Sequence, residues 1–132
     1  MKTPCYCEAA RVAARKTTAL YDAALASAGV TVAQYGLLRR IERAGAVSLT
    51  GLGRMSELDR STVGRNVRVL ERLKLVRLSA AEDQREAAVT LTPAGAEALE
   101  RAKPLWQDAQ RRVEAALGAK GAESLRALAL TL

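Results

Sequence analysis

Arginine side chains recur at helical spacing in the segment LDRSTVGRNVRVLERLKLV, which lies near the middle of the chain. Asp59, close to its start, is a residue type that caps helices. In a helix that begins there, one line of side chains is apolar with a lysine at its rim: Val63, Val67, Leu70 and Lys74. The opposite line carries Ser61, Arg65, Arg68 and Arg72. Guanidinium groups present a planar fork of N–H donors that fits phosphate oxygens and guanine edges, so this segment predicts a helix that binds a polyanion.

The two cysteines, Cys5 and Cys7, are separated by a single residue and could take part in thiol chemistry. A cysteine in the first turn of a helix feels the positive end of the helix dipole, and Arg11 one turn further on favours a thiolate. A metal site would need two more ligands, which without histidine would come from carboxylates or from a second subunit's cysteines. A disulfide between residues so close in sequence would be strained. Redox sensing, inert packing and metal or arsenical binding all stay open.

The composition restricts the classes of protein to which the chain can belong. Its 132 residues suit a single domain. No apolar run approaches the roughly 20 residues that cross a bilayer, so we expect a cytoplasmic protein with reduced cysteines and no membrane partner. The absence of histidine excludes His-based triads and His-zinc centres. Since no nucleophile and base pair appears, we expect neither an enzyme nor a cofactor. The formal net charge of +7 favours an anionic partner such as nucleic acid.

Three helices are expected ahead of the basic segment, and they would position it. Thr3 and Pro4 have the types of a helix cap and a first helical residue. Thr31 and Gln34 have the spacing of a capping box. The expected helices span 3–28, 31 to about 45, and about 50–55. Because the chain is 49% hydrophobic but only 3% aromatic, its core must consist of Leu, Val and Ala, which favours closely packed helices.

A β-hairpin is expected directly after the basic helix. Apolar residues alternate with other types on either side of the polar loop SAAEDQREA, at Val76, Leu78, Val89 and Leu91. A helix-turn-helix followed by such a hairpin is a winged helix, whose second helix enters the major groove of DNA. Arg85 at the tip would then reach the narrow minor groove, with Asp83 holding its guanidinium in position.

Three stretches in this order and spacing resemble the MarR-type winged-helix transcriptional regulators. They are LDRSTVGRNVRVLERLKLV, the wing motif Asp83-Gln84-Arg85, and Leu91-Thr92-Pro93-Ala94-Gly95 at the start of the last helix. The resemblance spans nearly the whole chain and implies a mainly α fold with a small β-hairpin wing. It implies one domain over 1–132, with dimerisation helices at 1–30 and 94–132 and a DNA-binding lobe at 31–93 whose wing lies near 79–88.

The resemblance also implies an obligate homodimer that grips a pseudo-palindromic double-stranded DNA operator. Ser61, Thr62 and Arg65 would lie at the major groove, and Arg68 would face phosphates. The complete set of implied DNA-binding residues is Arg60, Ser61, Thr62, Arg65, Arg68, Arg72, Asp83 and Arg85.

One branch of this family senses organic peroxides through a cysteine near the start of the first helix. Cys7 falls at that position, and Tyr21 falls at the position of one of its tyrosine partners. Two other tyrosine positions of the branch hold Arg11 and Val32 here. The resemblance thus implies a redox or effector site formed by Cys7, Cys5 and Tyr21.

The C-terminal part favours a dimer by its own pattern. After a long helical run over 94–117, Leu125, Leu128 and Leu132 recur at helical spacing, and a lone chain has little to cover them. Pro104 lies inside the run and should kink the helix or mark a break. Trp106 is expected either to pack at that bend or to line a small-molecule pocket.

These patterns predict a dimeric, sequence-specific DNA-binding transcriptional regulator that represses, released by oxidation at Cys7 or by a small-molecule effector. The alternatives are a basic RNA-binding module and a winged-helix module that binds only proteins. RNA binding favours exposed aromatic residues, whereas this chain has one Trp and three Tyr. A module that binds only proteins would not need outward arginines on its second helix.

Overall fold

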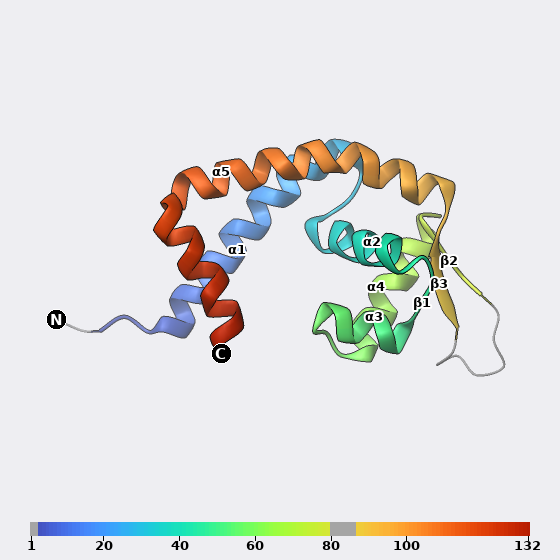
Figure 1. Cartoon of the computed structure of the whole chain (residues 1–132), viewed down its shortest axis with the longest axis horizontal. Helices are drawn as coiled ribbons and strands as arrows, with labels where there is room; N and C mark the ends of the chain where they lie inside the picture. Colours follow the sequence, from blue (N-terminus) through green and yellow to red (C-terminus); the bar gives the residue numbers. More distant parts are fainter. Residues whose placement is uncertain (1–2, 80–86) are drawn as a thin grey trace.

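The computed structural model describes residues 3–79 and 87–132, and over these ranges the chain is mainly helical with a small antiparallel sheet (Figure 1). Its helices are α1 (Tyr6–Leu25), a 3₁₀ turn (Ala26–Ala28), α2 (Val32–Ala44), α3 (Leu49–Ser56), α4 (Arg60–Arg72) and α5 (Pro93–Thr131). The strands are β1 (Val47–Ser48), β2 (Val76–Leu78) and β3 (Ala88–Leu91). The predicted fold, mainly α with a β-hairpin wing, is confirmed.

A compact lobe forms one end of the molecule, and the two longest helices lead away from it (Figure 1). The lobe contains α2, α3, α4, the sheet and the first turns of α5. Helix α1 packs along α5, and the start of α1 and the end of α5 both lie at the far end from the lobe. No helix among the described residues is long and apolar enough to span a bilayer.

The core of the lobe is made of aliphatic side chains, as the composition predicts. Leu38 and Ile41 of α2, Leu70 of α4 and Leu99 of α5 are completely buried and belong to one cluster. Burying a side chain of this size stabilises a fold by about 1.5 to 3 kcal/mol. The core that α4 shares with α2 and α5 therefore holds α4 in place, while the opposite face of α4 is exposed to solvent.

Side-chain caps set the starts of the lobe helices. The expected capping box of α2 is present, because the Thr31 hydroxyl accepts from the Gln34 N–H at 3.2 Å and Gln34 Oε1 accepts from the Thr31 N–H at 2.9 Å. Ser48, Asp59 and Thr92 cap α3, α4 and α5, each with a side-chain oxygen that accepts from the backbone N–H three residues further on. Each such cap is worth about 1 kcal/mol.

The predicted hairpin is present, and a third strand joins it. Strands β2 and β3 pair antiparallel, with Val76 opposite Leu91 and Leu78 opposite Val89. The short strand β1 pairs with the other edge of β3, which gives the order β1-β3-β2. Val76 and Val89 face the core.

The first helix begins later than the sequence indicates. Cys5, and not Thr3, is its N-cap, because Cys5 has extended backbone angles and its carbonyl accepts the first helical bond from Ala9 at 3.0 Å. Pro4 is therefore outside the helix. The far end agrees with expectation, since α1 passes into a 3₁₀ turn that ends at Gly29, where φ is +76°.

Two further details differ from expectation. Helix α5 continues through Pro104, so the expected break there is wrong, whereas a kink at Pro104 stays a prediction. The one residue of α5 with non-helical backbone angles is Gly118, at φ 73° and ψ 169°. Glycine adopts this conformation readily because it lacks a Cβ. Lys74 does not continue the apolar line of α4, because the helix has ended and Lys74 lies in the turn at φ 64°.

Helix α5 joins the lobe through a very close backbone contact. The Thr92 hydroxyl donates to the Lys74 carbonyl at 2.7 Å, and the Thr92 N–H donates to the Leu75 carbonyl at 3.1 Å. One turn later, a Cβ on Gly95 would lie 2.0 Å from the Leu75 carbonyl oxygen. Only glycine fits at position 95, so the start of α5 is fixed to the loop between α4 and β2.

Candidate nucleic-acid interface

Helix α4 presents a basic face to solvent. Val63, Val67 and Leu70 are fully buried beneath it. The opposite side carries Ser61, Arg65, Arg68 and Arg72, all of them exposed, and this set is called the reading face below. Arg60 is exposed at the start of the helix, and Thr62 is half-buried beside the reading face. The structure thus brings together the six candidate residues that the sequence places on this helix.

A hydrogen-bond network at the start of α4 is centred on Asp59. Its Oδ1 accepts from the Ser61 hydroxyl at 2.7 Å and from the Thr62 N–H at 2.8 Å. Its Oδ2 accepts from the Thr62 hydroxyl at 3.0 Å. These bonds, the backbone one first, lower the pKa of Asp59 to about 2. Arg65 joins the network, since its Nη2 donates to Thr62 Oγ1 at 3.3 Å.

A tight turn connects α3 to α4. Glu57 adopts the left-handed region at φ 54°, and the Leu58 N–H donates to the Gly53 carbonyl at 3.0 Å. A Cβ on Gly53 would lie 3.1 Å from the Leu58 carbonyl oxygen, which is closer than most real Cβ contacts. The small residue inside α3 therefore allows the turn to fold back and fixes the angle between the two helices.

The wing is only partly within the described residues. Arg77 of β2, a strand that contacts α4, is exposed. It is not among the predicted DNA-binding residues. Asp83 and Arg85, the predicted wing-tip residues, lie outside the described residues.

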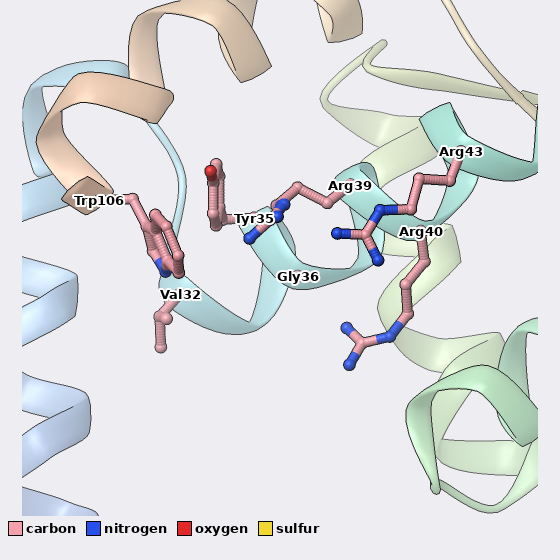
Figure 2. Close-up of a pocket in the computed structure, with 7 residues that line it drawn as sticks. All are labelled: Val32, Tyr35, Gly36, Arg39, Arg40, Arg43 and Trp106. Atoms are coloured by element: carbon pink, nitrogen blue, oxygen red, sulfur yellow. The ribbon is translucent and has the colours of Figure 1, made fainter. Parts of the chain in front are cut away.

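A second group of arginines lies on α2, and its role was not predicted from the sequence. Arg39, Arg40 and Arg43 line a cavity of about 220 Å³, called the arginine pocket below, together with Val32, Tyr35, Gly36 and Trp106 (Figure 2). None of the three arginines forms an ion pair with a carboxylate within residues 3–79 and 87–132. The available signal was their recurrence at i, i+1 and i+4 on one helix.

Aromatic rings form one side of the arginine pocket. Tyr35 and Trp106 stack with their ring centroids 5.7 Å apart. The guanidinium carbon of Arg39 lies 4.8 Å from the Trp106 ring centroid and 5.6 Å from that of Tyr35. Burial raises the pKa of Tyr35. Trp106 therefore packs on Tyr35 of the lobe and also lines the arginine pocket, and the binding of a small molecule there stays a prediction.

Arg40 connects the arginine pocket to the helix-turn-helix. Its Nε donates to the carbonyl oxygen of Met55 at 3.1 Å, in the last turn of α3. The guanidinium group also passes over Gly36, where a Cβ would lie 2.9 Å from Arg40 Nη1. One side chain thus reaches both the pocket and the turn that precedes Asp59.

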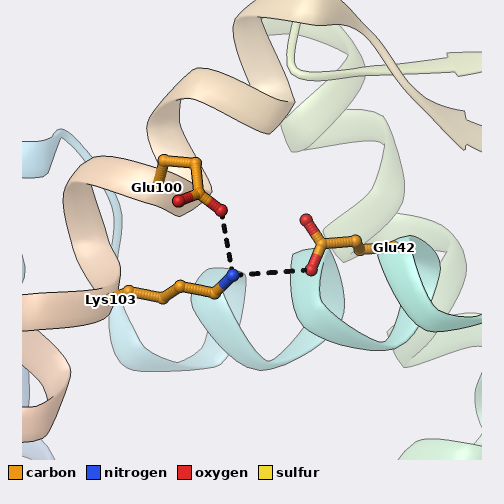
Figure 3. Close-up of polar contacts among 3 residues, drawn as sticks. All are labelled: Glu42, Glu100 and Lys103. Atoms are coloured by element: carbon orange, nitrogen blue, oxygen red, sulfur yellow. Dashed lines mark hydrogen bonds and ion pairs between the residues drawn. The ribbon is translucent and has the colours of Figure 1, made fainter.

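Lys103 links α5 to α2 (Figure 3). Its Nζ lies 2.9 Å from Glu100 Oε1 and 3.9 Å from Glu42 Oε1. The hydrogen bond to Glu100 is the main reason that the pKa of Lys103 is raised. These side chains are exposed, so the ion pairs contribute little stability.

Cys5 and Cys7 are free, exposed thiols at the start of α1. They border an open hollow with Glu8, Arg11 and Arg15. Among the described residues, no group of three or more cysteine or carboxylate side chains could hold a metal ion.

Tyr21 is not beside Cys7 within one chain. The two residues lie 14 positions apart on α1, which corresponds to about 21 Å along the helix axis. The Tyr21 hydroxyl hydrogen-bonds Gln110 Oε1 of α5, and burial raises its pKa, with a smaller contribution from Glu114. If these residues form one site, the cysteine must come from a second subunit.

Comparisons with known proteins agree on one family. A model of the MarR family matches residues 28–86. The transcriptional regulator MosR of M. tuberculosis is 32% identical with a TM-score of 0.80, over 95% of this chain and 90% of that chain. The structure of MosR in complex with DNA gives 33% identity and a TM-score of 0.78, over 98% and 100%. A probable transcriptional regulator from Pseudomonas aeruginosa is 28% identical with a TM-score of 0.83, over 95% of this chain and 94% of that chain. A comparison with curated proteins finds no match.

Proposed function

The chain belongs to the MarR family of transcriptional regulators, and on this premise we propose that it binds double-stranded operator DNA as a homodimer and represses transcription. The proposed contacts come from Arg60, Ser61, Thr62, Arg65, Arg68 and Arg72 of α4 and from Asp83 and Arg85 of the wing. The protein would act as a binder and not as an enzyme, in the cytoplasm where the chromosome is accessible.

The reading face is the observation that carries this proposal. A helix in the major groove needs exposed donors on one side and a packed apolar side that holds its orientation. Helix α4 has both, with exposed arginines opposite three fully buried side chains. The MosR structure in complex with DNA supports the same use of the fold.

Exposed leucines support the homodimer. Several leucines in the last part of α5 and directly after it, away from the lobe, are more than 40% exposed: Leu117, Leu125, Leu128, Leu130 and Leu132. Such an apolar surface is costly in water and is typical of an interface. We therefore assign 1–30 and 94–132 to dimerisation and 31–93 to DNA binding, with the wing near 79–88, while the first turns of α5 also pack in the lobe core.

Salt dependence of DNA binding tests the proposal. Each phosphate contact from a basic side chain releases about 0.9 counterions, so log K should fall linearly with log salt, and Arg68→Ala should reduce the slope by about 1. Arg101→Ala, which removes the same charge from an exposed position on α5, is the matched control and should leave the slope unchanged. Fluorescence anisotropy with DNA from upstream of the gene measures both. Equal slopes for all three proteins would reject the proposed contact between Arg68 and a phosphate.

The arginine pocket is the proposed effector site. Three cations that pair with no carboxylate in the described part of the chain favour an anion, and the stacked rings favour a flat apolar body. We therefore assign a small aromatic carboxylate as the ligand of this pocket. Trp106 is the single tryptophan, so its fluorescence reports on this pocket directly. Benzoate should quench it with a lower Kd than cyclohexanol does, and Arg39→Ala should weaken that binding whereas Arg101→Ala should not. Equal quenching by both compounds would exclude an anion site.

The exposed thiols support release by oxidation as a second route. The Cys7 thiolate would attack the distal oxygen of an organic hydroperoxide. An S–O bond forms as the O–O bond breaks, the alkoxide takes up a proton and leaves as the alcohol, and the thiol becomes a sulfenic acid. We expect hydroperoxide to release the wild-type protein from DNA. Cys7→Ser should stay bound to DNA, and Cys5→Ser should show a weaker release than the wild type. DNA that stays bound after mass spectrometry shows an oxidised Cys7 would exclude this route.

A further inference from the structure

The Asp59 carboxylate accepts hydrogen bonds from two hydroxyl groups at the start of α4. We propose that Asp59 determines which bases the protein reads. Because the hydroxyl groups of Ser61 and Thr62 both donate their protons to Asp59, only their oxygen lone pairs are left to form further hydrogen bonds. This inference rests on the proposed binding of operator DNA by α4, and it adds a specificity-determining residue that need not touch DNA itself.

The argument begins with the donor and acceptor capacity of a hydroxyl group. A hydroxyl has one proton to donate and two lone pairs that accept. An ionised carboxylate only accepts, so both hydroxyls must give their protons to Asp59, at 2.7 Å from Ser61 and 3.0 Å from Thr62. The low pKa of Asp59 keeps that carboxylate ionised throughout the physiological range. Ser61 is exposed on the reading face, and it therefore offers only acceptors to an approaching base.

Thr62 transmits the same constraint to Arg65. Its proton goes to Asp59, so its oxygen is free to accept from Arg65 Nη2 at 3.3 Å. This bond holds one side of the guanidinium fork and leaves the other N–H groups directed outward. An arginine fixed in this way suits the O6 and N7 acceptors of guanine.

Base edges in the major groove differ in the groups they offer. Adenine N6 and cytosine N4 are donors, whereas guanine O6 and N7 and thymine O4 are acceptors. An acceptor-only Ser61 therefore favours adenine or cytosine at the position it faces, next to a guanine read by Arg65. The predicted half-site contains this combination.

Asp59→Asn is the decisive substitution because it changes polarity and keeps the cap. Asparagine caps helices as well as aspartate does, and its Oδ1 can still accept from the Thr62 N–H. That oxygen also still accepts from the Ser61 hydroxyl, whereas Nδ2 takes the place of Oδ2 opposite the Thr62 hydroxyl. Because Nδ2 is a donor, the Thr62 hydroxyl must turn to accept from it and present its own proton elsewhere. Selection from a random-sequence DNA library should then show a reduced preference for guanine at the Arg65 position, by about three- to tenfold, which is the value of one hydrogen bond, with the preference at the Ser61 position unchanged.

Two further variants keep the test independent of Asp59→Asn folding. Ser61→Ala, at an exposed position, should flatten the preference for adenine or cytosine at that single base pair. Thr62→Val keeps the side-chain shape and removes the hydroxyl, so it should weaken the preference for guanine at the Arg65 position. Thermal unfolding followed by circular dichroism verifies that each variant is folded.

The outcomes separate this inference from the proposed function. If the wild-type protein selects no sequence, operator binding by α4 fails. If it selects one, and Asp59→Asn and Ser61→Ala select the same bases with the same ratios, Asp59 has no role in specificity. If these variants instead lost affinity equally for all sequences, the inference would also be overturned, since the hydroxyls would then face phosphates.

Discussion

At the scale of single residues, Asp59 combines a structural role with a proposed role in recognition. Its carboxylate accepts three hydrogen bonds from groups within the next three residues of the chain, although the side chain is exposed. The sequence predicted the cap from the residue type alone. It did not predict the bonds to Ser61 and Thr62, because several rotamers of each hydroxyl are compatible with a helix start and only the folded geometry selects one.

The shifted pKa of Asp59 predicts an acid-sensitive contribution to stability. The pKa is about 2 in the folded protein against an ordinary value of 3.8, so the ionised carboxylate stabilises the fold fully above about pH 4. That contribution is lost as the pH falls from about 4 towards 2. Urea unfolding of wild type and Asp59→Asn should therefore give a difference that shrinks over this window. Glu97→Gln, at an exposed position on α5, is the control, and a pH-independent difference for Asp59→Asn would contradict the expectation.

At the scale of elements, two glycines with opposite surroundings make a matched pair. A Cβ at position 95 meets the Leu75 backbone at 2.0 Å, whereas one at position 64 of α4 meets nothing within 4 Å. Gly95→Ala should lower the free energy of unfolding by about 3 kcal/mol, since the backbone cannot move aside cheaply. Gly64→Ala should raise it by about 0.5 to 1 kcal/mol through helix propensity. Chemical denaturation of both variants checks the signs, and a stable Gly95→Ala would show that α5 is not fixed to the lobe.

The elements that the sequence predicted well are those with a strong local signal. The capping box at Thr31, the cap at Asp59 and the alternation around β2 and β3 each determine their element without outside contacts. The start of α1 and the break in α5 depend on choices between nearly equal backbone states, and Pro104 was outweighed by the packing of its helix. The arginine pocket needed tertiary structure, because Trp106 is remote in sequence from the α2 residues it packs on.

At the scale of the whole molecule, the exposed leucines of α5 predict a dimer that charge can disrupt. Leu125→Glu combined with Leu128→Glu should yield a monomer, because carboxylates would be buried without partners in an apolar interface. Leu73→Glu makes the same change at a leucine of similar exposure at the end of α4 and should stay dimeric. Sedimentation velocity distinguishes the two masses. Monomeric wild-type protein would contradict the proposed assembly, and a dimeric double variant would place the interface elsewhere.

At the scale of the whole molecule, a small rotation at Gly118 would move the distant lobe by a much larger distance. Gly118 lies about 25 residues from the start of α5, or about 38 Å along the helix, and the lobe is fixed to that start through Thr92 and Gly95. With the chain beyond Gly118 held by a partner, a rotation of about 5° at this glycine would displace the lobe by about 3 Å, close to the 3.4 Å rise per base of a DNA strand. Each subunit would contribute its own displacement. A small angular change in a single backbone unit is therefore enough to move two reading helices out of step with the base pairs of their operator.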